Sequence, residues 1–327
     1  MMTYNNAVNN DEGNVSQLYH IPIMTNEVIQ YLNVEKGKIF VDCTLGGAGH
    51  GQAILNNLSD DGIFIGIDRD KDAIAHAHNH LRSKKHRIFL FHANYIELHD
   101  ILQSLNIDQV DGILADLGVS LNQIKNSGRG FSFLSHDPLD MRMNQADQIT
   151  AQDIVNSSDE QALSRLFFQY GEERYARVIA THIVKSRKKA LIRTSHELST
   201  IVLNAIPKKN QFRSKIHPAT RVFMALRIAV NHELEQVEIF MKNSINNLKS
   251  GGRMCVISFH SLEDRIVKQS IRQMEKGCIC PPDFPQCVCQ RSAIVKSINR
   301  SGIKPEAEEI ARNPMARSSR LRVIEKL

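Results

Sequence analysis

Two aspartates, Asp42 and Asp68, each end a short apolar run, and a glycine-rich turn lies between them. The runs, residues 39–41 and 63–67, contain the β-branched and aromatic residues typical of buried strands. The turn has glycines at positions 46, 47, 49 and 51, and the segment after it, to about Leu58, is compatible with a helix. Strand, glycine turn, helix, strand and acid form the first half of a nucleotide-binding α/β sheet.

The spacing of these residues indicates which ligand they bind. Asp68 lies 21 positions after Gly47 (68 − 47 = 21), at the spacing that brings an acid to a ribose diol. Asp42 precedes the glycines, and its charge would repel the pyrophosphate of a dinucleotide at the helix N-terminus. S-adenosylmethionine has no phosphate and carries a sulfonium and an ammonium. The pattern therefore favours this cofactor, and a capping role without a ligand is the alternative for Asp42.

Two further residues lie just after predicted strands. Residues 87–91 predict a third strand, and Tyr95 follows it, where its ring either lies against an adenine or packs under the next helix. Residues 110–115 predict a fourth strand, which ends on Asp116. Asp116 is therefore expected beside the point where strand order reverses and the cofactor binds.

The segment after Asp116 is longer than a crossover connection needs. The next convincing strand, Arg253–Ser258, begins 137 positions later (253 − 116 = 137), whereas a crossover takes a few dozen residues. The surplus has helical patterns at Gln161–Tyr170, Glu172–Arg187 and Ser195–Ile206, and Ala219 to about Leu248 is predicted as one long helix returning to the sheet. We predict a disordered tail over 1–17, a sheet domain over 18–125 and 219–327, and an inserted helical domain over 126–218.

Composition favours a folded protein with a polyanionic partner. The formal net charge is +6 and hydrophobic residues make up 42%, with a pI near 9.0. No apolar run of membrane-spanning length and no signal-peptide pattern occurs, so we expect a cytoplasmic protein with no membrane partner. Basic residues gather in the predicted insertion, which favours nucleic acid over an ordinary solvated face: Lys185, Arg187, Lys188, Lys189, Lys208, Lys209, Arg213 and Lys215.

Four of the six cysteines form one C-terminal cluster, Cys278-x-Cys280 and Cys287-x-Cys289. Four thiolates this close can complete a tetrahedral zinc site, although the spacing is CxC rather than the commoner CxxC. Unligated thiols on a proline-stiffened loop are the alternative. The predicted cofactor site itself includes no metal ligand.

Long motifs resemble one known family. From about Tyr19 to the C-terminus the chain contains, in matching order, DCTLGGAGHG, GIDRD, DGILADLGVS, RGFSF, LDMRM, GEER, HPATRVFMALRIAVNHEL, VISFHSLEDRIVK and NPMARSSRLRV. These blocks are similar to the bacterial 16S ribosomal RNA cytosine-N4 methyltransferases of the RsmH/MraW type. The resemblance implies a class I S-adenosylmethionine-dependent methyltransferase (Rossmann-like) α/β sheet with an inserted all-helical domain. It also implies methylation of N4 of a cytidine in the decoding centre of the small ribosomal subunit.

The resemblance also implies site residues. Matched by motif position, the cofactor contacts are Ala48, Gly49, His50, Asp68, Tyr95, Asp116 and Gln123. The family often has phenylalanine at the position of Tyr95, which keeps the aromatic ring.

The chemistry of the acceptor points to Asp116 as a catalytic residue. The exocyclic amine of cytosine gives its lone pair to the ring, and an oxygen that accepts one of its N–H groups would localise that pair and hold positive charge in the transition state. Asp116 is the first candidate, and binding of the cofactor amine is the alternative role. His217 and His260 are further candidate proton acceptors, with structural histidines as the alternative.

Two other classes of function remain possible from the sequence. A nicotinamide-dependent oxidoreductase uses the same strand, glycine and acid pattern, but Asp42 disfavours it. A non-catalytic ribosome-binding factor on the same fold is the other alternative.

Overall fold

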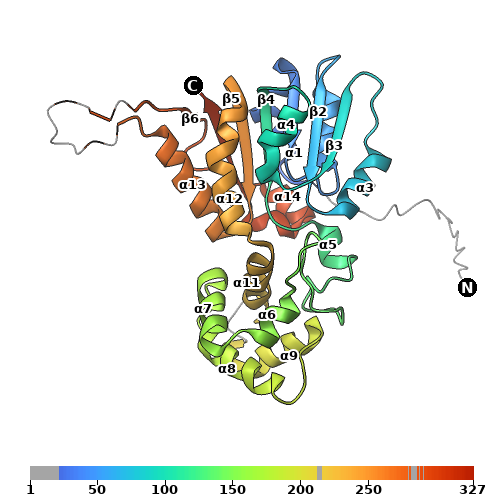
Figure 1. The fold of residues 1–327 in the computed structure, drawn as a ribbon, viewed down its shortest axis with the longest axis vertical. Helices are drawn as coiled ribbons and strands as arrows, with labels where there is room; N and C mark the ends of the chain where they lie inside the picture. Colours follow the sequence, from blue (N-terminus) through green and yellow to red (C-terminus); the bar gives the residue numbers. More distant parts are fainter. Residues whose placement is uncertain (1–21, 212–215, 279, 281–285, 287, 290) are drawn as a thin grey trace, which may run out of the picture.

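The computed structural model describes residues 22–327 except 212–215, 279, 281–285, 287 and 290. It contains a seven-stranded sheet in the order β3-β2-β1-β4-β5-β7-β6 (Figure 1). The predicted tail over 1–17, Arg213, Lys215 and Cys287 lie outside the described residues. The strands are β1 (Ile39–Asp42), β2 (Ile63–Asp68), β3 (Arg87–His92), β4 (Val110–Asp116), β5 (Leu248–Ser258), β6 (Val295–Ser297) and β7 (Arg320–Lys326).

The first five strands are parallel, and their order reverses at β1. Val41 of β1 pairs with Ile65 of β2 on one side and with Ile113 of β4 on the other. Strand β7 runs antiparallel between β5 and β6. Ligands of such sheets bind outside the carboxyl ends of the strands at the reversal point, here the ends of β1 and β4. The predicted α/β fold class is confirmed.

Each face of the sheet is covered by helices because both faces are apolar. Neighbouring strand residues alternate between two cores, as Phe40 and Val41 do in β1 and Phe64 and Ile65 in β2. One face packs against α1 (Thr25–Leu32), α2 (Gly49–Asn57) and α3 (Lys71–His80). The other packs against α4 (Leu98–Ser104), α12 (Glu233–Asn243) and α13 (Ser261–Glu275).

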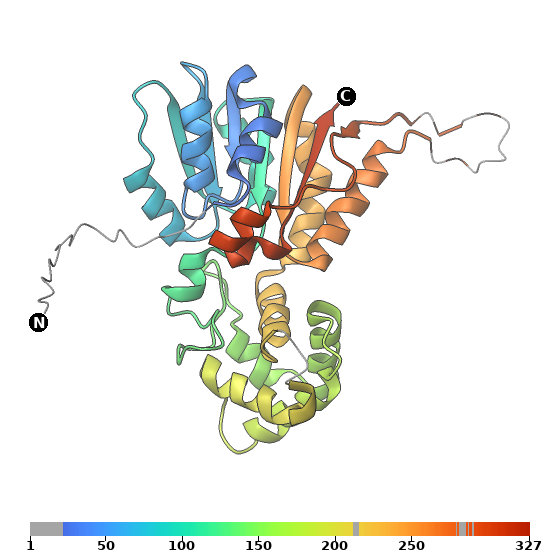
Figure 2. The ribbon, with the colours of Figure 1, turned by 180° about the vertical axis from the view of Figure 1, so that it is seen from behind.

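A helical region with its own core follows β4. Its buried residues form a cluster separate from the two cores of the sheet, and it extends the molecule beyond the sheet (Figures 1 and 2). The predicted second helix starts later than expected, at Ala176, because Glu172 adopts a left-handed conformation (φ 48°) that ends the helix before it. The helices are α5 (Leu121–Lys125), α6 (Ala151–Ser157), α7 (Glu160–Gly171), α8 (Ala176–Arg187), α9 (Ser195–Ala205), α10 (Lys208–Gln211) and α11 (Thr220–Asn231).

The long helix predicted from Ala219 to Leu248 is wrong. His232, with φ 50°, separates α11 from α12, so the two helices leave the break in different directions (Figure 1). Val222 and Leu226 of α11 pack in the core of the helical region, whereas Phe240 of α12 packs on the sheet. The division of the chain at residues 125 and 218 stays a prediction.

The C-terminal part adds α14 (Ala307–Arg312) before β7. Across the described residues, no helix combines the length and the apolar character that crossing a bilayer requires.

Candidate active site

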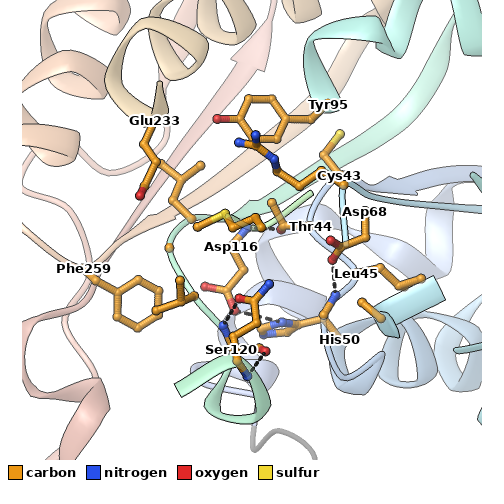
Figure 3. A pocket seen from close by; sticks show the side chains of 18 of the residues that line it. Cys43, Thr44, Leu45, His50, Asp68, Tyr95, Asp116, Ser120, Glu233 and Phe259 are labelled. Carbon is orange, nitrogen blue, oxygen red and sulfur yellow. Dashed lines mark hydrogen bonds and ion pairs between the residues drawn. The ribbon is translucent and has the colours of Figure 1, made fainter. Parts of the chain in front are cut away.

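A cavity opens at the carboxyl ends of β1, β2, β4 and β5. Figure 3 shows Asp116 between Asp68 on one side and Phe259 and Glu233 on the other. Ala48 does not line the cavity; it is buried and caps α2 with φ 61°. The other six predicted site residues all do: Gly49, His50, Asp68, Tyr95, Asp116 and Gln123.

The glycine-rich turn is fixed by its neighbours. Gly46 has φ +49°, a conformation that favours glycine, and its N–H donates to Asp68 Oδ2 at 2.7 Å. A Cβ at Gly49 would lie 2.7 Å from Cγ of Pro22. Gly49 is therefore required by packing against Pro22, and not only by close approach of a ligand.

Asp68 combines partial burial with two backbone donors. Its Oδ1 accepts from the Asp70 N–H at 2.8 Å, and its Oδ2 accepts from Gly46. Burial raises the pKa of Asp68 from 3.8 to about 6, against the lowering effect of these hydrogen bonds. A carboxylate acceptor at the end of β2 is what a ribose diol needs, so the geometry is compatible with the predicted role.

Negative charge accumulates at the end of β1. Burial, together with the nearby carboxylates of Asp116 and Asp68, raises the pKa of Asp42 to about 7. Asp42 is 1% exposed, and its Oδ1 accepts from the Thr44 N–H at 3.1 Å. A cationic ligand would relieve this repulsion and a pyrophosphate would increase it. The charge distribution therefore fits the sulfonium and ammonium of S-adenosylmethionine.

Asp116 lies against His50. The two side chains approach to 3.6 Å between Asp116 Oδ2 and His50 Nδ1. His50 Nε2 lies 2.8 Å from the carbonyl oxygen of Ile23 and must donate to it. A neutral His50 therefore turns the Nδ1 lone pair toward Asp116. The contact is attractive only when a further proton is present, either on His50 Nδ1 or on the Asp116 carboxylate.

Tyr95 both lines the cavity and packs under α12. Its ring meets the Phe240 ring edge to face, with centroids 5.1 Å apart, and burial raises the pKa of its hydroxyl well above 10. The described packing is against α12, which is not the next helix of the chain, and the contact of Tyr95 with an adenine stays a prediction.

Gln123 has its amide committed to the protein. Its Nε2 donates to Asp70 Oδ2 at 2.7 Å, and its Oε1 accepts from the Ser120 N–H at 2.9 Å. Asp70 also accepts from Arg129 in the helical region. Gln123 therefore links the loops after β2 and β4 and fixes their positions at the cavity.

The wall opposite Asp68 contains acidic residues for which the sequence analysis assigned no role. Glu233 and Glu263 both line the cavity, with Phe259 beside them. Arg227 binds both oxygens of Glu233, at 2.9 and 2.8 Å. The signal was available, since both glutamates lie in the NHEL and SLEDR segments of the matched motifs.

The two histidines proposed as proton acceptors lie in different environments. The His260 ring lies 3.1 Å from Glu263 and caps the first turn of α13. Burial alone would raise the pKa of Glu263, but the charge and hydrogen bond of His260 hold it below its usual value. His217 does not line the cavity; its ring stacks on Phe133 at 4.4 Å.

Comparison with known proteins gives a family match over almost the whole chain. Residues 17–327 match the model of the MraW methylase family. A protein of Desulfosudis oleivorans named ribosomal RNA small subunit methyltransferase H is 49% identical over 308 residues, 94% of this chain and 99% of the relative. One of the same name from Clostridium botulinum is 45% identical, with the same coverage of each chain.

Solved structures are more remote. An rRNA methylase from Streptococcus thermophilus has a TM-score of 0.37 and 10% identity, covering 93% of each chain. NSun6 from Pyrococcus horikoshii has a TM-score of 0.42 and 12% identity, covering 93% of this chain and 52% of its own. These scores are too low to support an assignment, which rests on the family model and the sequence relatives. The oxidoreductase and the non-catalytic alternatives are not favoured, and the resemblance seen in the motifs is confirmed: the chain belongs to the MraW methylase family.

Proposed function

We propose that this protein transfers a methyl group from S-adenosylmethionine to N4 of a cytidine in the decoding centre of small-subunit (16S) ribosomal RNA. The relatives named ribosomal RNA small subunit methyltransferase H support the substrate class. The observation that carries the chemistry is the position of Asp116 between a ribose-binding acid and an acidic and aromatic wall (Figure 3).

The cofactor is held from the β1, β2 and β3 side of the cavity. Asp68 accepts hydrogen bonds from the ribose hydroxyls, and the ring of Tyr95 packs against the adenine. Asp42 and Asp116 supply negative charge close to the reacting centre. When bound, S-adenosylmethionine supplies a methyl group already activated by its sulfonium, so most of the barrier reduction comes from in-line positioning.

The acceptor cytosine enters from the opposite side. Methylation of one base amine requires the nucleotide to swing out of its surroundings into a pocket. The cavity lining includes the Phe259 ring and Met143, and the base lies between Phe259 and Asp116. An amine in this position donates one N–H to the Asp116 carboxylate, which stabilises the positive charge that develops on nitrogen.

The proton released after transfer has an acceptor within the site. Asp116 and His50 form a pair that is attractive when it holds one proton. A proton taken up by Asp116 therefore converts its contact with His50 into a hydrogen bond, and the pair returns the proton to solvent after the product leaves.

A basic surface of the helical region supports RNA binding. Lys185, Lys188 and Lys189 are exposed at the end of α8, at the end of the molecule away from the sheet (Figure 1). Arg187, from the same run, instead donates to the carbonyl oxygen of Val155 at 2.7 Å and ties α8 to α6. Three of the four charges of this run are therefore available to phosphates.

The function is tested with small ribosomal subunits from a strain that lacks the enzyme. After incubation with S-adenosylmethionine and the protein, the RNA is digested and its nucleosides are identified by mass spectrometry. N4-methylcytidine at a single decoding-centre position is expected. Methylation of a ring carbon of cytidine, or no methyl transfer despite cofactor binding in calorimetry, would contradict the proposal.

A further inference from the structure

Three cysteine thiols that methyl transfer does not use come together in the connection between α13 and β6. The sulfur atoms of Cys278, Cys280 and Cys289 all lie within 4.8 Å of one another. The Sγ atoms of Cys278 and Cys289 are 3.8 Å apart. The described end of this connection leads into β6, the edge strand of the sheet (Figures 1 and 2).

The sulfur spacing is that of metal ligands. Zinc–sulfur bonds of about 2.3 Å in a tetrahedron place neighbouring sulfurs about 3.8 Å apart. A disulfide would bring two sulfurs to about 2.05 Å. The separation of Cys278 and Cys289 matches the first distance and is far from the second.

Hydrogen bonds hold the two ends of this connection together, next to the cysteines. The Ile294 N–H donates to the carbonyl oxygen of Met274 at 3.0 Å, and the Ser297 N–H donates to Oε1 of Glu275 at 2.6 Å. A Cβ at Gly277 would lie 3.4 Å from the Ala293 nitrogen. Cys278 directly follows this glycine, so the first of the thiols lies next to the point where the two segments are in contact.

The described residues contain one other group that could bind a metal ion, made of two glutamates and a histidine, and it is a weaker candidate site. Glu233, His260 and Glu263 also have ligand atoms within 4.8 Å of one another. Both oxygens of Glu233, however, are bound by Arg227, whose charge would oppose a cation. The cysteine group offers three soft thiolate ligands, which select zinc over hard cations.

We propose that Cys278, Cys280 and Cys289 bind a structural Zn²⁺ that closes the connection between α13 and β6. The fourth position of the tetrahedron is not assigned from the described residues. Cys287 lies outside them. Zinc here contributes folding free energy to the connection and takes no part in methyl transfer.

The test uses the full chain, freed of metal under reducing conditions and titrated with Co²⁺ and then with Zn²⁺. One Co²⁺ per chain is expected, with the ultraviolet thiolate charge-transfer absorption and the intense visible bands of a tetrahedral site. Stoichiometric Zn²⁺ should abolish both. Replacing any one of the three cysteines by serine should weaken metal binding by at least about tenfold, with unchanged far-ultraviolet circular dichroism.

Two controls make the outcome specific. Cys255→Ala removes a thiol buried in β5 and should leave the metal spectrum unchanged. Glu233→Gln, which alters the rival cluster, should leave it unchanged as well. If Co²⁺ shows no thiolate absorption, or binds equally to a variant lacking Cys278, Cys280 and Cys289, the proposal is wrong.

Discussion

Asp70 and Arg129 form a buried ion pair that ties the sheet to the helical region, with Asp70 Oδ2 2.5 Å from Arg129 Nη2. Both side chains are at most 5% exposed. Asp70 lies two residues after the predicted ribose-binding acid, and Arg129 also donates to the carbonyl oxygens of Arg142 and Met143. The pair therefore links the cofactor side of the cavity to the segment that brings Met143 to it.

Removing one partner of this pair should destabilise the protein strongly. Asp70→Asn leaves the Arg129 charge buried without a counter-ion, which typically costs about 3–5 kcal/mol. We expect a clear fall in the melting temperature, measured by calorimetry. As a matched control, Arg312→Gln breaks an ion pair with Glu308 whose members are 80% and 85% exposed, and it should leave the melting temperature unchanged.

Replacing Asp68 should weaken cofactor binding. Asp68→Ala removes the charge-assisted hydrogen bonds to the ribose, each worth roughly 1.5–3 kcal/mol. It also leaves the Gly46 N–H without its acceptor, so the turn loses order. Titration calorimetry with S-adenosylmethionine should show at least about a tenfold loss of affinity. Normal affinity with a native circular dichroism spectrum would mean that the ribose binds elsewhere; Asp60→Ala, on the surface, is the control.

The buried carboxyls predict a dependence of stability on pH. The pKa values of Asp42 and Asp68, about 7 and about 6, are raised above the 3.8 of a free carboxyl by burial. The folded protein thus binds these protons more tightly than the unfolded chain. Their stabilising contribution is complete below 3.8 and is lost as pH rises through about 6 to 7.

Stabilisation by the bound cofactor should increase with pH over the same range, opposite to the contribution of the protonated carboxyls. Its positive charge favours the ionised carboxylates, so the rise in melting temperature produced by S-adenosylmethionine should grow between about pH 6 and 7. Asp42→Asn should make this rise smaller and less dependent on pH. A cofactor effect that is constant with pH in both proteins would contradict the charge argument.

The exposed lysines of α8 should contribute to RNA binding. Changing Lys185, Lys188 and Lys189 together to glutamine removes three charges, so affinity for small subunits should fall and its dependence on salt should become less steep. Arg187 is left unchanged because it supports α6. The control changes Lys36, Lys38 and Lys84, which are also exposed. Equal losses in the two variants would show that net charge alone matters, and filter binding over a range of salt concentrations measures both.

The sequence predicted the parts of the fold that depend on local patterns. The glycine turn, the acids at strand ends and the length of the insertion indicated the sheet, the helical region and two acids of the cavity, Asp68 and Asp116. It did not predict the break at His232, because helical periodicity continues across a single residue with positive φ. Glu233 was assigned no role although it lies in a matched motif, because the motif does not show that its side chain reaches the cavity.

The roles of Gly49 and Gln123 depend equally on contacts that are distant in sequence. Gly49 accommodates Pro22, and the amide of Gln123 bridges Asp70 and Ser120. Motif matching places such residues near a ligand, whereas the contacts show that they also hold the surrounding loops. Similarly, the CxC spacing left zinc and unligated thiols open, and only the fold shows that the sulfurs of Cys278, Cys280 and Cys289 lie within 4.8 Å of one another.

The central claim is that methyl transfer to a cytosine amine takes place at Asp116, and single-turnover kinetics tests it most directly. With saturating S-adenosylmethionine and unmodified small subunits, the parent protein should form N4-methylcytidine. Asp116→Asn should form it at least about 100-fold more slowly, because an amide accepts a hydrogen bond but does not offset the developing positive charge. Affinities for RNA and cofactor, measured in parallel, should change much less than the rate. Transfer by Asp116→Asn at the parent rate would contradict the account and leave positioning alone as the source of catalysis.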